Sequence, residues 1–125
     1  MATSPFLQLL GVRLTRLHKD GITIECPFAP NLSNVFGGIH GGVSATLADA
    51  AAAFAIHQQH GAFRRITTVD LKINYFRPVM EGKLFARARM LRMGSKLCTA
   101  AVELTDGQRR AAGTALVTYM ILGDD

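Results

Sequence analysis

The sequence has no tryptophan and only two cysteines, Cys26 and Cys98, which are far apart and form no CxxC pair. We therefore expect reduced, half-buried thiols and a cytoplasmic protein rather than a disulfide framework. Long hydrophobic runs are also missing. The most apolar stretch, residues 43–56, is too short for a membrane span and contains Asp49. The first residues lack the charged and apolar regions of a signal peptide, so we expect no membrane partner.

Acidic residues are scarce, with 9 Asp and Glu against 14 Lys and Arg, which gives a formal net charge of +5. The basic residues are spread along the chain and are not interleaved with aromatic residues, as they are in proteins that bind single strands. Nucleic acid is therefore not an expected partner. A modest positive charge fits a small anionic molecule with several phosphates, although an ordinary solvated surface would give the same composition.

Repeats, low-complexity tracts and linkers are absent from the 125 residues, and 49% of them are hydrophobic, so we expect a single domain over residues 1–125. Alanine is the best helix former, and its density predicts one long helix over residues 41–57. A Ser-Pro start predicts a short helix over residues 4–10. Alternating patterns between turn signals predict strands at 12–18, 22–26, 68–76, 83–90, 98–104 and 109–122.

These elements predict an α+β fold, in which five or six mostly antiparallel strands wrap one central helix. The small residues along most of the helix suit close approach by backbone on several sides. Such a sheet has edges that can pair, so a homodimer is expected. Strict alternation in the strand at 68–76 places Val69, Leu71, Ile73 and Tyr75 on one face and Thr68 on the other.

Asp49 is the unusual residue of the predicted long helix. Its neighbours at three and four positions are Ala45, Thr46, Ala52 and Ala53, so no Lys or Arg pairs with it along the helix. A solvated helix face would carry further charges. Asp49 is therefore predicted to face a pocket or a partner subunit, where partial loss of water sharpens a carboxylate as a base or nucleophile. The alternative is an isolated surface aspartate, or one bonded to a buried backbone group.

His40-Gly41-Gly42 stands at the start of the same helix. The first N–H groups of a helix have no internal acceptor and carry the positive end of the helix dipole. Glycines let a ligand carbonyl approach this backbone, so the triplet fits an oxyanion hole with the Gly41 N–H as donor. His40 can orient or polarise the same carbonyl. A glycine-rich turn in which His40 packs as a loop residue is the alternative.

Residues 34–49 (NVFGGIHGGVSATLAD) resemble the signature of hotdog-fold acyl-CoA thioesterases of the phenylacetate-pathway (PaaI-like) and 4-hydroxybenzoyl-CoA thioesterase-like type. The likeness covers nearly the whole chain and includes residues 68–70 (TVD) and 75–78 (YFRP). It implies a hotdog fold, a homodimer or a dimer of dimers (a homotetramer), and active sites at the subunit interface.

The resemblance also assigns site residues. The family's loop asparagine matches Asn34, its histidine and oxyanion glycine match His40 and Gly41, and its helix acid matches Asp49. A hydroxyl residue that the other subunit contributes, Ser in some members, matches Thr68.

The implied substrate is an acyl-CoA, so coenzyme A is part of the substrate and no separate cofactor or metal is expected. Basic groups near strand ends are implied to hold its phosphates, and the candidates are Arg92, Gly94 and Lys96, with a solvated turn as the alternative. His57 and His60 have no third ligand nearby and are predicted to cap the helix end rather than to bind metal.

The residues and the resemblance agree on hydrolysis of a small aryl- or acyl-CoA thioester. Asp49 either attacks the carbonyl, giving a mixed anhydride, or activates water as a general base, and the sequence does not choose between these routes. Two other functions stay open. One is hydration or dehydration of an acyl thioester on the same fold, and the other is acyl-CoA binding without catalysis.

Overall fold

The computed structural model describes residues 4–123. Within them the chain forms two α-helices, one short 3-10 helix (η1) and six strands. In chain order they are α1 (Pro5–Leu10), β1 (Arg13–His18), β2 (Gly21–Pro27), η1 (Pro30–Leu32), α2 (Gly41–His60), β3 (Ile66–Tyr75), β4 (Lys83–Met93), β5 (Leu97–Asp106) and β6 (Ala111–Ile121).

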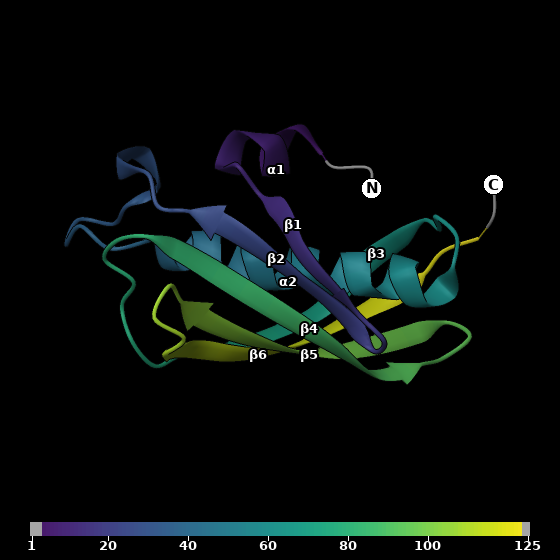
Figure 1. Cartoon of the computed structure of the whole chain (residues 1–125). Coiled ribbons are helices and arrows are strands. Elements are labelled where there is room, and N and C mark those ends of the chain that lie inside the picture. The colour runs from purple at the N-terminus through teal and green to yellow at the C-terminus, as the bar shows by residue number, and fades with distance from the viewer. Residues whose placement is uncertain (1–3, 124–125) are drawn as a thin grey trace.

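The six strands form one sheet in the order β1-β2-β4-β5-β6-β3, and all neighbouring pairs are antiparallel. The sheet curves around α2, and α1 lies above it (Figure 1). The predicted α+β fold with one central helix is therefore confirmed. The strand that directly follows α2 in the chain, β3, becomes an edge of the sheet beside β6, while β1 is the opposite edge.

Helix α2 begins and ends at residues that satisfy its backbone. His40 is the N-cap with extended backbone, and its side chain accepts a hydrogen bond from Gly42 N–H. Gly61 ends the helix in the left-handed conformation (φ 80°), and its N–H bonds to the His57 carbonyl. The helix runs three residues beyond the predicted end at 57, because this glycine rather than the last apolar residue terminates it.

The alanines of α2 let the sheet come close to the helix. Ala48, Ala51, Ala52 and Ala55 have no exposed surface, and the helix packs against β2, β3, β4, β5 and β6. Larger side chains fill the core from the strands, and Ile22, Ile24, Leu84, Val102 and Val117 are fully buried. The core also buries both cysteines completely. The expectation of half-buried thiols is thus wrong, because both side chains occupy positions on the helix-facing side of the sheet.

A β-bulge in β3 changes which side chains face the helix. Thr68 pairs with Tyr119 and Asp70 pairs with Thr118, so the register shifts between them and Val69 is the extra residue. Tyr119 is buried on the helix side of the sheet, and Thr68 joins it there. The strict alternation predicted for β3 is therefore wrong at Thr68, and the bulge turns its hydroxyl toward α2.

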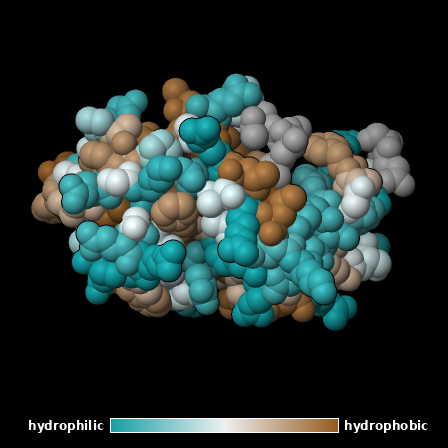
Figure 2. All heavy atoms as spheres, viewed as in Figure 1, coloured by the Kyte–Doolittle hydropathy of each residue, from teal (hydrophilic) through white to brown (hydrophobic). Residues whose placement is uncertain are grey.

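The face that Figure 2 shows is mainly hydrophilic, with apolar side chains gathered in its upper middle. Phe6 and Leu9 of α1 and Leu14 and Leu17 of β1 are among the exposed large hydrophobic residues. Neither helix of residues 4–123 has the length and hydrophobicity needed to cross a membrane. The α1–β1 region lies at the sheet edge opposite β3.

We expect enlargement of a buried alanine in α2 to destabilise the fold. Ala51→Leu adds volume where no space is left, and overpacking of this kind typically lowers the free energy of unfolding by about 1–3 kcal/mol. Ala53→Leu is the matched control, since Ala53 lies on the same helix but is only partly buried. Urea unfolding of both variants measures the difference, and equal loss of stability would contradict the close packing described here.

Candidate active site

The first turn of α2 contains one N–H group that is hydrogen-bonded within the chain and one that is not. The Gly42 N–H donates to His40 Nδ1 over 2.9 Å. The Gly41 N–H donates to no acceptor within residues 4–123. Because His40 Nδ1 is an acceptor here, the neutral imidazole carries its proton on Nε2, where it can be donated. The helix start therefore offers two donors, the Gly41 N–H and His40 Nε2–H.

Both glycines of the triplet lie close to an aromatic or imidazole ring. A Cβ on Gly42 would lie 3.1 Å from His40 Nδ1, and one on Gly41 would lie 3.3 Å from the ring of Tyr75. The Tyr75 hydroxyl donates to the Gly41 carbonyl over 2.5 Å. Desolvation by burial raises the pKa of Tyr75, which keeps it a neutral donor. The last residue of β3 is thereby tied to the first residue of α2.

Asp49 bonds to the other end of the same strand. The Thr68 hydroxyl donates to Asp49 Oδ1 over 2.8 Å. The buried hydroxyl of Tyr119, on β6, donates to the Asp49 backbone carbonyl over 3.0 Å. Burial raises the pKa of Tyr119 well above its usual value, so this phenol remains neutral. Thr68 and Tyr119 together fix both the side chain and the backbone of Asp49.

The Thr68–Asp49 contact corrects one expectation. The resemblance implied that Thr68 would come from the other subunit, but the hydrogen bond joins two residues of one chain. The short connection between α2 and β3 sends the strand back along its own helix, and the bulge at Val69 turns Thr68 toward it.

Asn34 shapes the loop before α2 rather than reaching out of it. Its Oδ1 accepts hydrogen bonds from the N–H groups of Phe36 (2.8 Å) and Gly38 (3.2 Å). Its backbone N–H donates to the Gly38 carbonyl. Only the amide nitrogen of the side chain is left to donate to a ligand, because the oxygen is committed within the loop.

A cavity of about 360 Å³ adjoins the start of α2. Asn34, Gly41 and Ser44 contribute to its wall, and Tyr75 closes one side. The rest of its wall is mainly apolar and comes from Ile39, Phe76, Pro78, Val79, Leu104 and Ala112, with Arg77 as a cation. The free Gly41 N–H thus lies beside a partly apolar space at the lower end of the volumes typical of ligand sites.

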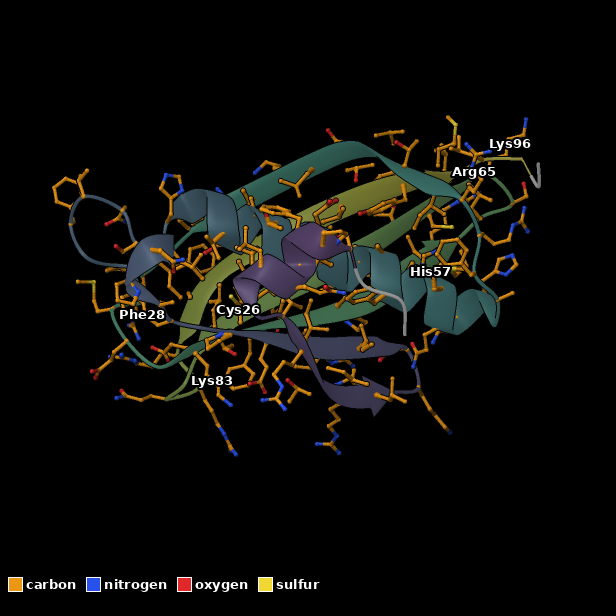
Figure 3. All side chains as sticks on the ribbon, turned by 90° about the horizontal axis from the view of Figure 1, so that it is seen from above. Cys26, Phe28, His57, Arg65, Lys83 and Lys96 are labelled. Carbon is orange, nitrogen blue, oxygen red and sulfur yellow. The ribbon has the colours of Figure 1, made fainter. Side chains whose placement is uncertain are left out.

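The predicted phosphate-binding residues lie at the sheet end that is distant from Gly41. Arg92 and Lys96 are exposed, and Gly94 forms the β4–β5 turn through a hydrogen bond to the Leu97 carbonyl (2.9 Å). Arg65 lies at the same end, as Figure 3 shows for Arg65 and Lys96.

The carbonyls of Lys96 and Arg65 accept from Ile121 and Leu122, so the two residues flank the end of β6. Sequence analysis had not grouped Arg65 with this turn, because the pairing of β3 with β6 is not visible in the sequence.

His57 and His60 were predicted to cap the end of α2, but their side chains bond instead to Arg64 in the segment that follows the helix, His60 Nε2 to the guanidinium over 3.1 Å. His57 Nε2 bonds to the Arg64 carbonyl over 2.9 Å, and its ring stacks on Phe63. Among residues 4–123 no three His, Cys, Asp or Glu side chains are grouped so that they could hold a metal ion.

The structure brings some predicted residues together and separates others. His40 and Gly41 share one helix end with Tyr75, and Asp49 joins Thr68. Gly41 and Asp49 are eight residues apart on one helix, which is about 12 Å along its axis.

Sequence analysis missed the roles of Tyr75 and Tyr119, because nothing in a strand pattern distinguishes a tyrosine that bonds to the helix backbone from one that only packs.

Comparison with known proteins agrees with this arrangement. The sequence profile of the Thioesterase superfamily matches residues 36–112. A curated relative, the medium/long-chain acyl-CoA thioesterase YigI of Escherichia coli, is 27% identical over 132 aligned residues, covering 94% of this chain and 85% of YigI.

Two solved structures show the same fold. A conserved protein of Pseudomonas aeruginosa has a TM-score of 0.90 at 28% identity, covering 96% of this chain and 95% of its own. The PaaI protein of the Escherichia coli phenylacetic acid degradation operon has a TM-score of 0.87 at 20% identity, covering 96% and 86%, and at that identity it shows the fold alone. The predicted family is confirmed, and the chain belongs to the thioesterase superfamily, as a thioester hydrolase with the hotdog fold.

Proposed function

We propose that the protein hydrolyses a small aryl- or acyl-CoA thioester to the free acid and CoA at a site shared by two copies of the chain. The name of YigI, an acyl-CoA thioesterase, supports a CoA thioester as the substrate. Asp49 of one copy supplies the base or nucleophile, and the helix start of the other copy polarises the carbonyl. A cytoplasmic location stays a prediction, as does the assembly of two such dimers into a tetramer.

The distance between Gly41 and Asp49 is the main support for this proposal. An oxyanion donor and a base that act on the same carbonyl must each lie about 3 Å from the reacting atoms. Two turns of α2 hold Gly41 and Asp49 about 12 Å apart along the axis. One chain therefore cannot place both groups on one thioester, and a second copy has to supply the missing group.

The exposed edge of β3 offers the way for two copies to meet. β3 has ten residues and leaves one side unpaired, and Val69 and Tyr75 on it are about half exposed. Antiparallel pairing of two β3 edges about a two-fold axis near Leu71 places Tyr75 of one copy near Thr68 of the other. Tyr75 is bonded to Gly41 and Thr68 to Asp49. The pairing thus brings the Gly41 N–H of one copy toward Asp49 of its partner.

The chemistry follows from these donors and acceptors. The thioester oxygen accepts from the Gly41 N–H and from His40 Nε2–H, which stabilises the negative charge that develops on it. Either the Asp49 carboxylate attacks the carbonyl carbon or it takes a proton from an attacking water. Collapse of the tetrahedral intermediate breaks the C–S bond and releases the CoA thiolate. The direct route then needs water to hydrolyse the mixed anhydride.

The end of the sheet that carries Arg65, Arg92 and Lys96 is placed to bind the coenzyme in this arrangement. Arg65 precedes Thr68 by three residues, about 10 Å of extended strand. Arg65, Arg92 and Lys96 therefore lie on the Asp49 side of the shared site, at a distance that an extended pantetheine arm bridges easily. We propose that these side chains bind the CoA phosphates and that Gly94 keeps the turn between them tight.

We expect Asp49→Asn to abolish hydrolysis, because an amide neither accepts the proton of water nor forms an anhydride. Purified protein is assayed against a panel of aryl- and fatty-acyl-CoA thioesters while the free thiol is followed. We expect kcat to fall by about 10³-fold or more with the fold retained.

The controls separate the alternatives. Hydrolysis that survives unchanged in Asp49→Asn would rule out the mechanism. Binding of the thioesters without turnover by the wild-type chain would instead favour a non-catalytic acyl-CoA-binding module, and addition of water to an enoyl thioester without thiol release would favour a hydratase.

We expect Thr68→Val to lower kcat by about tenfold to a hundredfold while KM changes little. The variant keeps the shape of the side chain but removes the hydroxyl that fixes Asp49 Oδ1, and a hydrogen bond to a charged group contributes about 1.5–3 kcal/mol. Thr68→Ser keeps the hydroxyl and is the matched control. Equal activity of the Val and Ser variants would show that this hydrogen bond has no part in the reaction.

A further inference from the structure

Ser44 is a buried polar side chain that the proposed reaction does not use. It lies in the second turn of α2 and only 8% of its surface is exposed. Its hydroxyl makes no hydrogen bond within residues 4–123. Among residues 4–123 no fully buried side-chain oxygen or nitrogen lacks a partner, so the Ser44 oxygen still reaches solvent where the residue lines the cavity. A ligand that fills the cavity takes water away from this hydroxyl, which then needs a hydrogen-bond partner on the ligand.

The neighbouring Thr46 makes the side-chain hydrogen bond to the helix backbone that Ser44 lacks. The Thr46 hydroxyl donates to the Gly42 carbonyl of the preceding turn over 2.8 Å, which is the usual way in which a helix satisfies such a group. The corresponding carbonyl for Ser44 belongs to His40, and it accepts only from the N–H groups of Val43 and Ser44. The Ser44 hydroxyl is thus left available on the side of the helix that borders the cavity.

The cavity gives this hydroxyl a defined position relative to the reaction. Ser44 and Gly41 both line the space of about 360 Å³, together with apolar side chains such as Ile39 and Leu104. They are three residues apart on one helix face, so Ser44 lies about 4.5 Å deeper along the axis than Gly41. An acyl group that runs into this cavity from a thioester oxygen at the Gly41 N–H would have its second and third carbons beside Ser44.

From this geometry we infer that Ser44 selects acyl groups that carry a hydroxyl or oxo group on the second or third carbon. The inference rests on the proposed function and names its substrate class: short or aromatic oxygenated acyl thioesters. The bound oxygen gives the Ser44 hydroxyl the partner it lacks, whereas an unsubstituted acyl group leaves it buried and unpaired. The cavity wall also holds Asn34, Tyr75 and Arg77, but Ser44 is the polar group that follows Gly41 on the same helix face.

Matched pairs of substrates test the inference. The wild-type chain is assayed with 3-hydroxybutyryl-CoA against butyryl-CoA and with 2-hydroxybenzoyl-CoA against benzoyl-CoA. We expect kcat/KM to be about tenfold higher for the oxygenated member of at least one pair. In Ser44→Ala the ratio falls to about one, because the oxygenated member loses its hydrogen bond and the unsubstituted member no longer leaves a hydroxyl unpaired.

Two further variants control for structural effects. Ser44→Thr keeps a hydroxyl and is expected to keep the preference. Thr46→Val removes the hydroxyl that is already bonded within the helix, and is expected to leave the ratio unchanged.

A wild-type ratio near one for both pairs would overturn the inference, as would a ratio that survives in Ser44→Ala or an equal loss for both members of a pair. These outcomes leave the proposed function intact. Failure of the wild-type chain to hydrolyse any thioester would remove the proposed function itself, and the inference with it.

Discussion

Helix α2 fixes the distance between its first residue, Gly41, and Asp49, and the proposed reaction depends on that separation. Its start offers the Gly41 N–H and the His40 ring, and Asp49 follows two turns later. Each position is tied to β3, the first through Tyr75 and the second through Thr68. In the proposed reaction, the contact between α2 and β3 therefore holds the carbonyl-binding group at one end and the base at the other, and these are too far apart to act together within one chain.

Several local features make this contact between α2 and β3 possible. The fully buried alanines of α2 let the sheet approach the helix, which brings β3 close enough for side chains to cross-link it. The bulge at Val69 turns Thr68 to the helix side, where Tyr119 already lies. The glycines at 41 and 42 leave room for the Tyr75 and His40 rings.

The sequence predicted the parts of the site that depend on local order. Helix α2, its glycine-rich start and the isolated Asp49 all follow from spacing along one element. Thr68 could not be placed, because a bulge shifts the register by one residue and leaves no mark in an alternating pattern. Asn34 matched the family position, yet its bonds to Phe36 and Gly38 depend on the folded loop. Tyr119 and Arg65 joined the site region only through strand pairing, which is a long-range property.

The most direct test of the shared site mixes two inactive chains. Gly41→Pro removes the N–H donor at the first helical position, where proline is well tolerated and the extended backbone of His40 suits it. Gly41→Ala adds a Cβ near Tyr75 but keeps the N–H, so it controls for bulk. Chains carrying Gly41→Pro and Asp49→Asn are co-expressed, and thioesterase activity is compared with each variant alone.

If two copies share each site, half of the randomly formed dimers contain one intact site of two, and about a quarter of the wild-type activity returns. No recovery above the two separate variants, with dimers of mixed chains present, would show that one chain holds a complete site and would contradict the account.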